Sequence, residues 1–374
     1  MTVGEAVTFA IVAPTAEHLI CNQGVPGSNP GDGSIFEVIM LRPVMLTYGT
    51  DPEGFFERDG QIIGSSRVLP VGGLINNAYG KPFVVEDGVQ FELNPAPANT
   101  VHGLATNLEN AFGLLRGCLE SQPGVSLNWD KIVTVSRTEL DALDQKAREL
   151  GCLPSMNIYG SQPLRCDVKT YRKRSPGGHV HVGLEHTNIF SHGRDARQRL
   201  IPLYDIFVGQ WCVLLDRDPG AAERRENYGR AGEFRLPEHG VEYRTLDNFW
   251  VRSYTLMSFV FGMTNLATSI LVHTIAGGQQ EKELVNIVNV PRMRKAIEKN
   301  DIRLATRNIL ELEPWLSKNL PATGFPIRPG MLRKFVELGK HIDHHGITSV
   351  FPDDPLTHWK KGVRVDFTTF LERL

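Results

Sequence analysis

The sequence predicts an α+β fold with an antiparallel sheet and a helical C-terminal third. Short β-rich segments occupy much of the chain before residue 249, and they do not alternate regularly with helices, which argues against a doubly wound parallel sheet. After residue 249 apolar residues recur mostly with the helical period. With 41% hydrophobic and 22% charged residues among 374, the composition is that of an ordinary globular protein with a sizeable core.

The pattern places the individual elements as follows. Strands are expected at Leu46–Tyr48, Gln61–Ile63, Phe83–Glu86, Val89–Leu93, Ile132–Val135, His179–Gly183 and Val241–Thr245. Helices are expected at Thr100–Cys118, Thr138–Leu150 and Asp195–Leu215, and then near 249–275, 280–288, 291–299, 302–314, 329–342 and 355–373. The most apolar stretch, Leu256–Ala276, contains Ser258, Thr264 and Asn265, so a buried helix is favoured over a membrane span.

The first 44 residues differ in character from the rest. The run NQGVPGSNPGDGS at Asn22–Ser34 is rich in Gly, Pro, Ser and Asn and offers little to bury. We interpret residues 1–44 as a flexible or non-native extension, with Met40 or Met45 as the first residue of the working protein. Residues 45–374 are then expected to form a single domain.

Charge and cysteine content narrow the class of protein. The net charge of −2 gives no global basic field for nucleic acid. The five cysteines are scattered without CxxC spacing, which suits a reducing cytoplasm better than a disulfide framework. No basic segment of a secretory signal opens the chain.

Four polar pairs at i, i+2 spacing are the chemical signal in this sequence. Side chains two apart on a strand share a face, and the residues between these pairs are mostly apolar. One face of the sheet should therefore be apolar and covered by helices, while the other carries the polar groups. The pairs are Asp51 with Glu53, Glu92 with Asn94, His179 with His181, and Glu242 with Arg244.

Carboxylates and imidazoles gathered on one face need water, each other or a bound ion, because burying them unpaired is costly. Hard oxygen ligands of this kind suit Mg²⁺ or Mn²⁺. Each pair alone also has a bland interpretation. The HxH pair fits a structural role, the ExR pair fits an exposed salt bridge, and Asn94 before Pro95 fits the end of a strand.

A basic cluster precedes the last strand, in the segment RRENYGRAGEFR from residue 224 to 235. Guanidinium groups match phosphate oxygens in geometry, and glycines allow close backbone approach. The segment therefore fits a polyphosphate site or, taken alone, a solvated basic loop. Its arginines are Arg224, Arg225, Arg230 and Arg235, beside Gly229 and Gly232.

These motifs together resemble a known superfamily. GGHVHVG resembles the HxH strand of glutamine synthetases and of glutamate–cysteine ligase relatives, and EYR resembles their late ExR strand. The ordered set GTDPE, ELNP, GGHVHVG, YGRAGEFR and EYRTLDNFW is similar to the type 2 carboxylate–amine ligases of bacteriophages. The resemblance covers about Leu46 to Trp250.

The resemblance implies a glutamine-synthetase-like curved antiparallel sheet with helices on its outer face, holding ATP and two or three Mg²⁺ ions, or Mn²⁺. It implies metal ligation by Asp51, Glu53, Glu92, His179 and Glu242. We expect nucleotide or phosphate contacts from Asn94, Arg224, Arg225, Tyr228 and Arg230, and the resemblance implies catalytic roles for His181, Arg235 and Arg244. The segment GCLPSMNIY departs from the family, because Leu153 and Ser155 stand where acidic residues are usual.

The implied reaction is ATP-dependent amide formation through an acyl phosphate, on small-molecule or peptide carboxylates and amines. The compartment is the cytoplasm, that of the host if the chain is phage-encoded. Three alternatives remain open: a guanidino-type phosphotransferase on the same sheet, a zinc hydrolase using His179, His181 and a carboxylate, and a non-enzymatic phage protein on a degenerate ligase scaffold.

Overall fold

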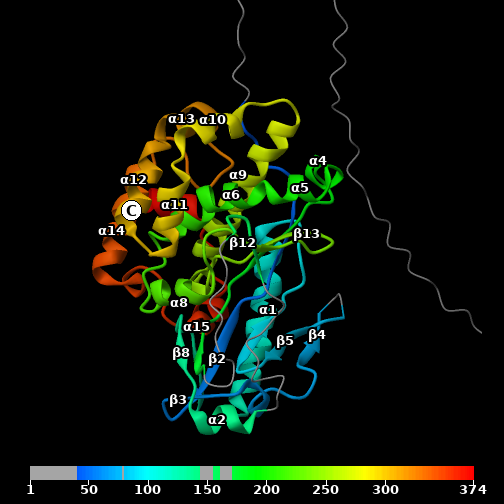
Figure 1. Ribbon diagram of the computed structural model, residues 1–374. Coiled ribbons are helices and arrows are strands. Elements are labelled where there is room, and N and C mark those ends of the chain that lie inside the picture. Colours follow the sequence, from blue (N-terminus) through cyan, green and yellow to red (C-terminus); the bar gives the residue numbers. More distant parts are fainter. Residues whose placement is uncertain (1–39, 78–79, 144–154, 161–170) are drawn as a thin grey trace, which may run out of the picture. The chain divides into compact units, whose positions relative to one another are not determined.

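The computed structural model describes residues 40–77, 80–143, 155–160 and 171–374 (Figure 1). These residues all belong to the compact unit Ile39–Leu374, while Met1–Val38, most of the predicted extension, lies outside the described residues. Leu41 is fully buried, and its N–H donates to the carbonyl of Asn319 at 3.0 Å. The compact part of the chain therefore begins before residue 44, where the extension was expected to end, because Leu41 is already packed into the core.

The first sheet consists of antiparallel strands in the order β1 (Thr47–Thr50), β11 (Val180–Gly183), β13 (Gly240–Tyr243), β12 (Glu233–Arg235) and β9 (Met156–Asn157). Its register sets His181 directly opposite Glu242, and Glu242 directly opposite Arg235. Because direct neighbours across strands share a face, these three side chains form one row. The alternate residues, including Val180, Val241 and Tyr243, are buried on the other face, as expected.

The second sheet is also antiparallel. Its order is β3 (Gln61–Ile63), β2 (Glu53–Arg58), β6 (Gln90–Leu93), β5 (Pro82–Asp87) and β4 (Leu74–Asn76), and β7 (Val125–Asn128) pairs with β2. A short ribbon pairs β8 (Val133–Thr134) with β10 (Lys173–Arg174). The chain leaves the first sheet after Thr50 and enters the second at Glu53. The prediction of one sheet carrying all four polar pairs is therefore wrong, since Asp51 lies between two strands that belong to different sheets.

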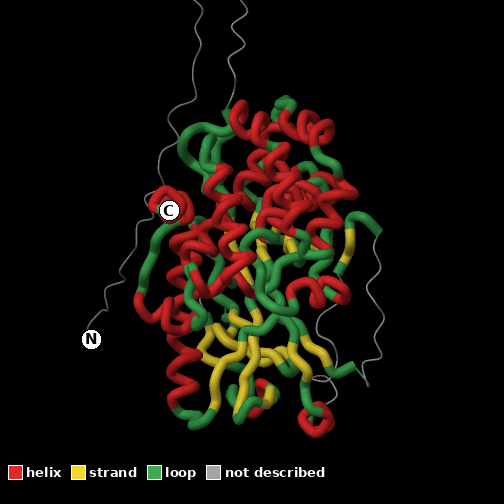
Figure 2. Tube along the Cα trace, turned by 90° about the vertical axis from the view of Figure 1, so that its left-hand side faces the viewer, coloured by secondary structure: helices red, strands yellow, loops and turns green. Residues whose placement is uncertain are grey.

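Helices make up most of the remaining described chain. They are α1 (Val101–Glu120), α2 (Arg137–Ala142), α4 (Asn188–Ser191), α5 (Gly193–Gln198), α6 (Leu200–Tyr204), α7 (Gln210–Cys212), α8 (Ala221–Asn227), α9 (Tyr254–Ile275), α10 (Gln280–Ile287), α11 (Val290–Glu298), α12 (Ile302–Glu311), α13 (Glu313–Asn319), α14 (Leu332–His345), α15 (Pro355–Lys361) and α16 (Phe367–Arg373). Single turns are η1 (Ser65–Arg67), the π-helical η2 (Asp205–Gly209), η3 (Asn248–Arg252) and η4 (Ile347–Ser349). The α+β class (Figure 2) and the helical C-terminal third (Figure 1) are confirmed. The predicted helix Thr138–Leu150 corresponds to α2, and its part from residue 144 lies outside the described residues.

The long helix α9 begins where Ser253 accepts a hydrogen bond from the N–H of Leu256. By length and composition it is the one described helix that could cross a membrane, yet 89% of its most apolar window is buried inside the protein. The hydroxyls of Thr264 and Thr268 donate to helix carbonyls one turn earlier. The prediction of a buried core helix is therefore confirmed.

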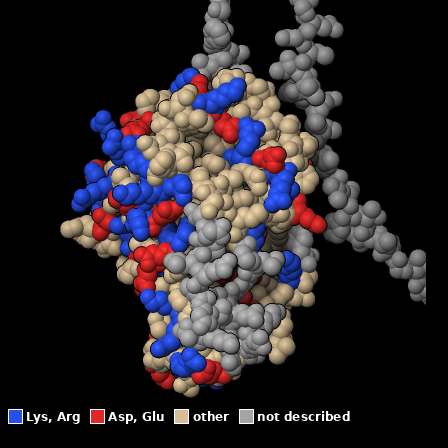
Figure 3. Space-filling model, viewed as in Figure 1, with Lys and Arg blue, Asp and Glu red and all other residues tan. Residues whose placement is uncertain are grey.

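Lys and Arg on the helical third are interspersed with Asp and Glu (Figure 3). Two arginines, Arg292 and Arg307, pair with the same carboxylate of Glu311, and Lys318 pairs with Glu283 at 2.6 Å. Exposed pairs of this kind contribute little to stability.

Candidate active site: two acidic clusters where the sheets meet

The first cluster consists of Asp51, which follows β1, His179, which precedes β11, and Glu242 of β13. Their potential ligand atoms lie within 4.8 Å of one another. The Nδ1 of His179 lies 3.0 Å from the Oδ1 of Asp51 and 3.7 Å from the Oε1 of Glu242. The Asp51 and His179 atoms are both buried and have no hydrogen bond of good geometry. Buried polar atoms in this condition fit a bound cation.

The second cluster belongs to the second sheet and consists of Glu53, Asp87 and Glu92, again with ligand atoms within 4.8 Å. Glu53 and Glu92 are direct neighbours across β2 and β6. The carboxylate of Glu53 accepts the N–H of Gly177 at 2.6 Å and the side-chain amide of Gln90.

Asp87 is a site residue that the sequence interpretation missed. It ends β5 directly opposite Gln90 of β6. Part of the signal was present, because Asp87-Gly88 lies between two expected strands, and the hairpin turns at Gly88 and Val89. The observed register sets Val85 opposite Glu92, and Asp87 lies two residues further along the same face of β5.

Gly177 lies against one residue of each cluster. A Cβ atom there would collide with the imidazole of His179 and would lie 3.2 Å from the Oε1 of Glu53. At the next position, a Cβ on Gly178 would collide with the carbonyl of Asp247. Because Gly177 and Gly178 have no side chains, the backbone of segment 176–178, which we call the wall, can lie close to both clusters.

The two clusters differ in their protonation. Burial favours protonation of Asp51, but the imidazoles of His179 and His181 outweigh it and hold the pKa of Asp51 well below its usual range. Burial lowers the pKa of His179 to about 4, which leaves a neutral imidazole suited to ligation.

In the second cluster, burial and then the negative charge of Asp87 raise the pKa of Glu53 well above its usual range. Burial, and then the charges of Asp51 and Asp87, raise the pKa of Glu92 to about 8. These carboxylates repel one another, so a divalent cation would relieve the repulsion.

Two of the predicted catalytic residues adjoin the first cluster. The Nη1 of Arg244 pairs with Glu242, while its other nitrogens donate to the hydroxyl of Tyr228 at 2.7 Å and to that of Ser155 at 2.9 Å. The Nη1 of Arg235 lies 3.6 Å from the Oε1 of Glu242, and 24% of the Arg235 side chain is exposed. Arg235 is thus the more accessible of the two guanidinium groups.

The other polar residues near the clusters are also placed by contacts. Tyr228 contacts the Nε2 of His179 through its hydroxyl. The Nε2 of His181 lies 3.2 Å from the Oδ2 of Asp51. Asn94 follows β6, and its side chain hydrogen-bonds to Glu92.

The structure does not support a phosphate-binding role for Arg224 or Arg225. Arg224 is fully buried, and its guanidinium donates to the carbonyls of Pro176, Thr245 and Leu246 at 2.9–3.1 Å. Each of the three guanidinium nitrogens donates to a backbone carbonyl, which fits a structural role.

Arg225 is buried too, and it pairs with Asp216 at 2.6 Å and donates to Asn300. Arg230 is partly exposed and contacts the carbonyl of Glu226, so its nucleotide role remains a prediction.

The potential ligands are carboxylate oxygens in both clusters, with one neutral imidazole in the first. This set of donors fits Mg²⁺ or Mn²⁺. The zinc alternative expected His179 and His181 to converge with a carboxylate. Within the described residues, the trio that converges contains His179 and two carboxylates, and His181 lies outside it.

A comparison with known families matches part of the chain. Residues 160–286, which include the HxH and ExR strands, match the family described as "Phage phiEco32-like COOH.NH2 ligase-type 2". The match supports the prediction of an enzyme of the ATP-dependent carboxylate–amine ligase class, and it does not test the individual site residues.

Among solved structures, the chain is similar to a bifunctional glutathione synthetase from Pasteurella multocida, with 13% sequence identity and a TM-score of 0.44. The similarity covers 84% of this chain and 50% of the synthetase, so the chain spans about half the length of that enzyme. Nothing about activity follows from a similarity this distant. The comparison with curated proteins gives no match.

Proposed function

We propose that the protein joins a carboxylate to an amine at the expense of ATP, through an acyl phosphate. The observation that carries this proposal is the pair of acidic clusters back to back across Gly177, with the partly exposed Arg235 beside one of them. A site for one metal ion would not need two crowded carboxylate sets. A polyphosphate with its divalent cations would use both.

The two trios are the groups that would hold Mg²⁺ or Mn²⁺. Bound there, the cations would supply neutralising positive charge to the phosphate oxygens of ATP. His179 would contribute its neutral Nδ1, and its Nε2 is fixed by Tyr228.

Arg235 is the group best placed to contact the transferring phosphoryl, because its guanidinium is accessible and stands in the row with Glu242. Arg244 is 3% exposed, and its guanidinium contacts Glu242, Tyr228 and Ser155. We assign Arg244 to orienting Glu242 and Tyr228. His181 orients the second oxygen of Asp51.

In the first step an oxygen of the carboxylate substrate attacks the γ-phosphorus of ATP, and the bond from that phosphorus to the β-phosphate oxygen breaks, releasing ADP. In the second step the amine nitrogen attacks the carbonyl carbon of the acyl phosphate. The carbon–oxygen bond to phosphate breaks, inorganic phosphate leaves, and the amine loses a proton. The proposed substrates are small-molecule or peptide carboxylates and amines, in the cytoplasm.

The test is the fate of the phosphoryl group across a panel of amino acids, short peptides and amines. We expect ADP and inorganic phosphate in equal amounts with an amide of the summed mass less water. With the correct acid and no amine, ADP release should be slow, and hydroxylamine should speed it by trapping a hydroxamate. A stable phosphorylated product would instead identify a phosphotransferase, and turnover with zinc and no ATP would identify a hydrolase.

A further inference from the structure

A buried polar network lies behind the two clusters, and the proposed chemistry does not use it directly. At its centre Lys131 has a side chain that is 1% exposed. Its ammonium lies 3.1 Å from Asp218, 3.6 Å from Asp247 and 2.6 Å from the Oδ1 of Asn248. A buried ammonium needs partners of this kind, so the lysine fixes the Asn248 side chain in one orientation.

Asn248 connects this network to the second cluster. Its Oδ1 accepts from Lys131, and its Nδ2 donates to the backbone carbonyl of Glu53 at 2.8 Å. Glu53 begins β2 and supplies a carboxylate to the cluster, so Asn248 holds the backbone from which that carboxylate extends.

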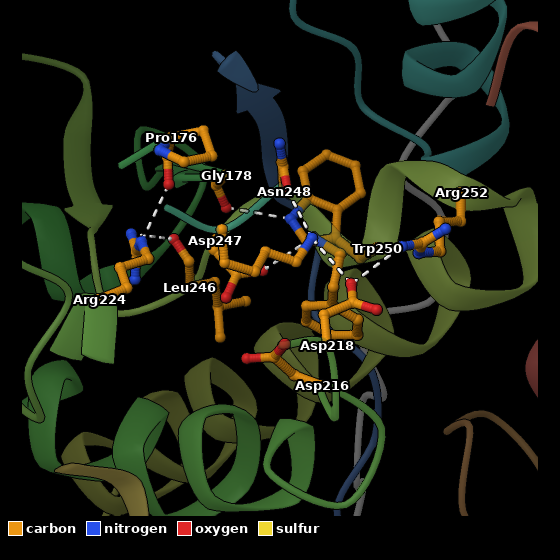
Figure 4. A network of polar contacts seen from close by, with 12 residues as sticks. Pro176, Gly178, Asp216, Asp218, Arg224, Leu246, Asp247, Asn248, Trp250 and Arg252 are labelled. Atoms are coloured by element: carbon orange, nitrogen blue, oxygen red, sulfur yellow. Dashed lines mark hydrogen bonds and ion pairs between the residues drawn. The ribbon is translucent and has the colours of Figure 1, made fainter. Parts of the chain in front are cut away.

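The same region holds two carbonyls of the wall between the clusters, the segment 176–178 (Figure 4). The carbonyl of Pro176 accepts from Arg224 at 2.9 Å, and that of Gly178 accepts from the indole of Trp250 at 3.0 Å. The carbonyl of Gly177 accepts the N–H of Glu53 at 2.9 Å. A shift of Glu53 would therefore move the wall, and with it His179 of the first cluster.

Asp218 has a second cationic partner besides Lys131. Arg252 pairs with Asp218 and Asp353, each at 3.0 Å. Asp247 caps η3 by accepting the N–H of Phe249 at 2.9 Å. The order Asp247, Asn248, Trp250 thus places three anchors on one short turn after the ExR strand.

We propose that Asn248 is a positioning residue for both cation sites, acting through its bond to the Glu53 carbonyl while Lys131 locks its orientation. The inference rests on the proposed function, because it takes the two clusters to be cation sites. Outer contacts of this kind orient ligands and are felt in metal affinity.

The test compares three variants for Mn²⁺ binding without nucleotide, followed by the paramagnetic resonance signal of free Mn²⁺. Asn248→Ala removes both hydrogen bonds. Asn248→Asp keeps the shape and the acceptor for Lys131 but loses the donor to Glu53. Asn308→Ala is the matched control, because Asn308 is also buried and accepts from an arginine, Arg292, in the helical third.

We expect Asn248→Ala and Asn248→Asp each to weaken Mn²⁺ binding by about tenfold or more, with kcat largely recovered at saturating Mn²⁺. Asn308→Ala should leave Mn²⁺ binding at the parent value, whatever it does to thermal stability. Parent-like Mn²⁺ binding by Asn248→Asp would overturn the link to Glu53, even if Asn248→Ala fails to fold. If the parent protein does not bind Mn²⁺, the proposed cation sites themselves are overturned. If the parent binds Mn²⁺ and neither Asn248 variant changes the affinity, only the positioning role of Asn248 is overturned.

Discussion

The two acidic clusters have the same number of potential ligands but opposite electrostatic settings. The cluster of Asp51, His179 and Glu242 has its own positive partners, since Arg244 and Arg235 lie against Glu242. In the part of the chain that the structure describes, no lysine or arginine forms an ion pair with Glu53 or Glu92. The first cluster is organised before any cation binds, whereas the second is a set of repelling carboxylates that a cation would complete.

This difference gives the clusters separate roles in the proposed reaction. A cation-dependent cluster is suited to bind metal together with the polyphosphate. A cluster with built-in arginines is suited to the transferring phosphoryl group, because preorganised charge needs no reorganisation during the reaction.

The largest expected effect concerns Arg235. Arg235→Lys keeps the charge but loses the two-pronged geometry that matches phosphate oxygens. We expect turnover to fall by about 10³-fold with little change in the ATP requirement, as for catalytic arginines in phosphoryl transfer. Steady-state ADP release at varied ATP measures both.

The control for this variant is Arg199→Lys, which alters an arginine paired on the surface with Glu281 and should leave turnover unchanged. If Arg235→Lys raises only the ATP requirement, Arg235 binds the ground state. The first cluster would then have no special part in the transfer.

The next effect separates the clusters by stability. Glu92→Gln and Glu242→Gln should each weaken Mn²⁺ binding on the order of tenfold or more, because each removes a ligand charge. Without metal, Glu92→Gln should be at least as stable as the parent, since it relieves repulsion. Glu242→Gln should lose about 2 kcal/mol, because the buried Arg244 loses its carboxylate partner.

Chemical denaturation in the presence of a chelator measures the free energies of unfolding of these two variants. Equal destabilisation by both would contradict the electrostatic contrast between the clusters.

A smaller change tests whether the clusters share one wall. Gly177→Ala adds a methyl group that must displace the His179 ring and crowd Glu53, so Mn²⁺ binding should weaken at both clusters by severalfold. Gly113→Ala in α1 is the control, because its added Cβ would meet nothing within 4 Å. Titration with Mn²⁺ that shows one site weakened and the other at its parent affinity would show that the wall is not shared.

The sequence predicted the elements better than it predicted how they assemble. Thr100 was expected to start a helix and caps α1, and Gln61–Ile63 is a strand as expected, because local periodicity and capping residues are readable along the chain. Pairing between distant strands is not readable in this way. The pair Asp51 and Glu53 therefore seemed to share a face, whereas the chain crosses between sheets at Pro52.

The candidate site was predicted unevenly for the same reason. His179 and Glu242 were expected to lie on one face, with Arg235 in a basic segment beside it, and the structure brings the three together. Composition alone could not distinguish Arg224 from Arg235, because which arginine is buried depends on the packing of α8. The network around Asn248 could not be predicted, although Asn248 lies in the motif EYRTLDNFW, since the network is assembled from residues far apart in the chain.

The smallest effect expected is a dependence of metal-free stability on pH, to which the second cluster contributes. The pKa of Glu92 is raised to about 8 and that of Glu53 is also raised, both by burial first and neighbouring carboxylates next. A glutamate in the unfolded chain has a pKa near ~4.3. The folded protein therefore holds more protons than the unfolded chain at intermediate pH, and stability must fall as pH rises from about 4.3 through about 8.

With a chelator present, we expect Tm to fall by roughly 2–4 °C between pH 6 and 8.5. Saturating Mg²⁺ should abolish most of that fall, because the cation replaces the protons, and Glu92→Gln should reduce it without metal. The first cluster predicts the opposite trend at acid pH, since the lowered pKa of Asp51 favours the folded state until Asp51 is protonated. A Tm that is level from pH 6 to 8.5 with chelator, in the parent and in Glu92→Gln alike, would mean that the second cluster is not the repelling, cation-dependent set inferred from its geometry.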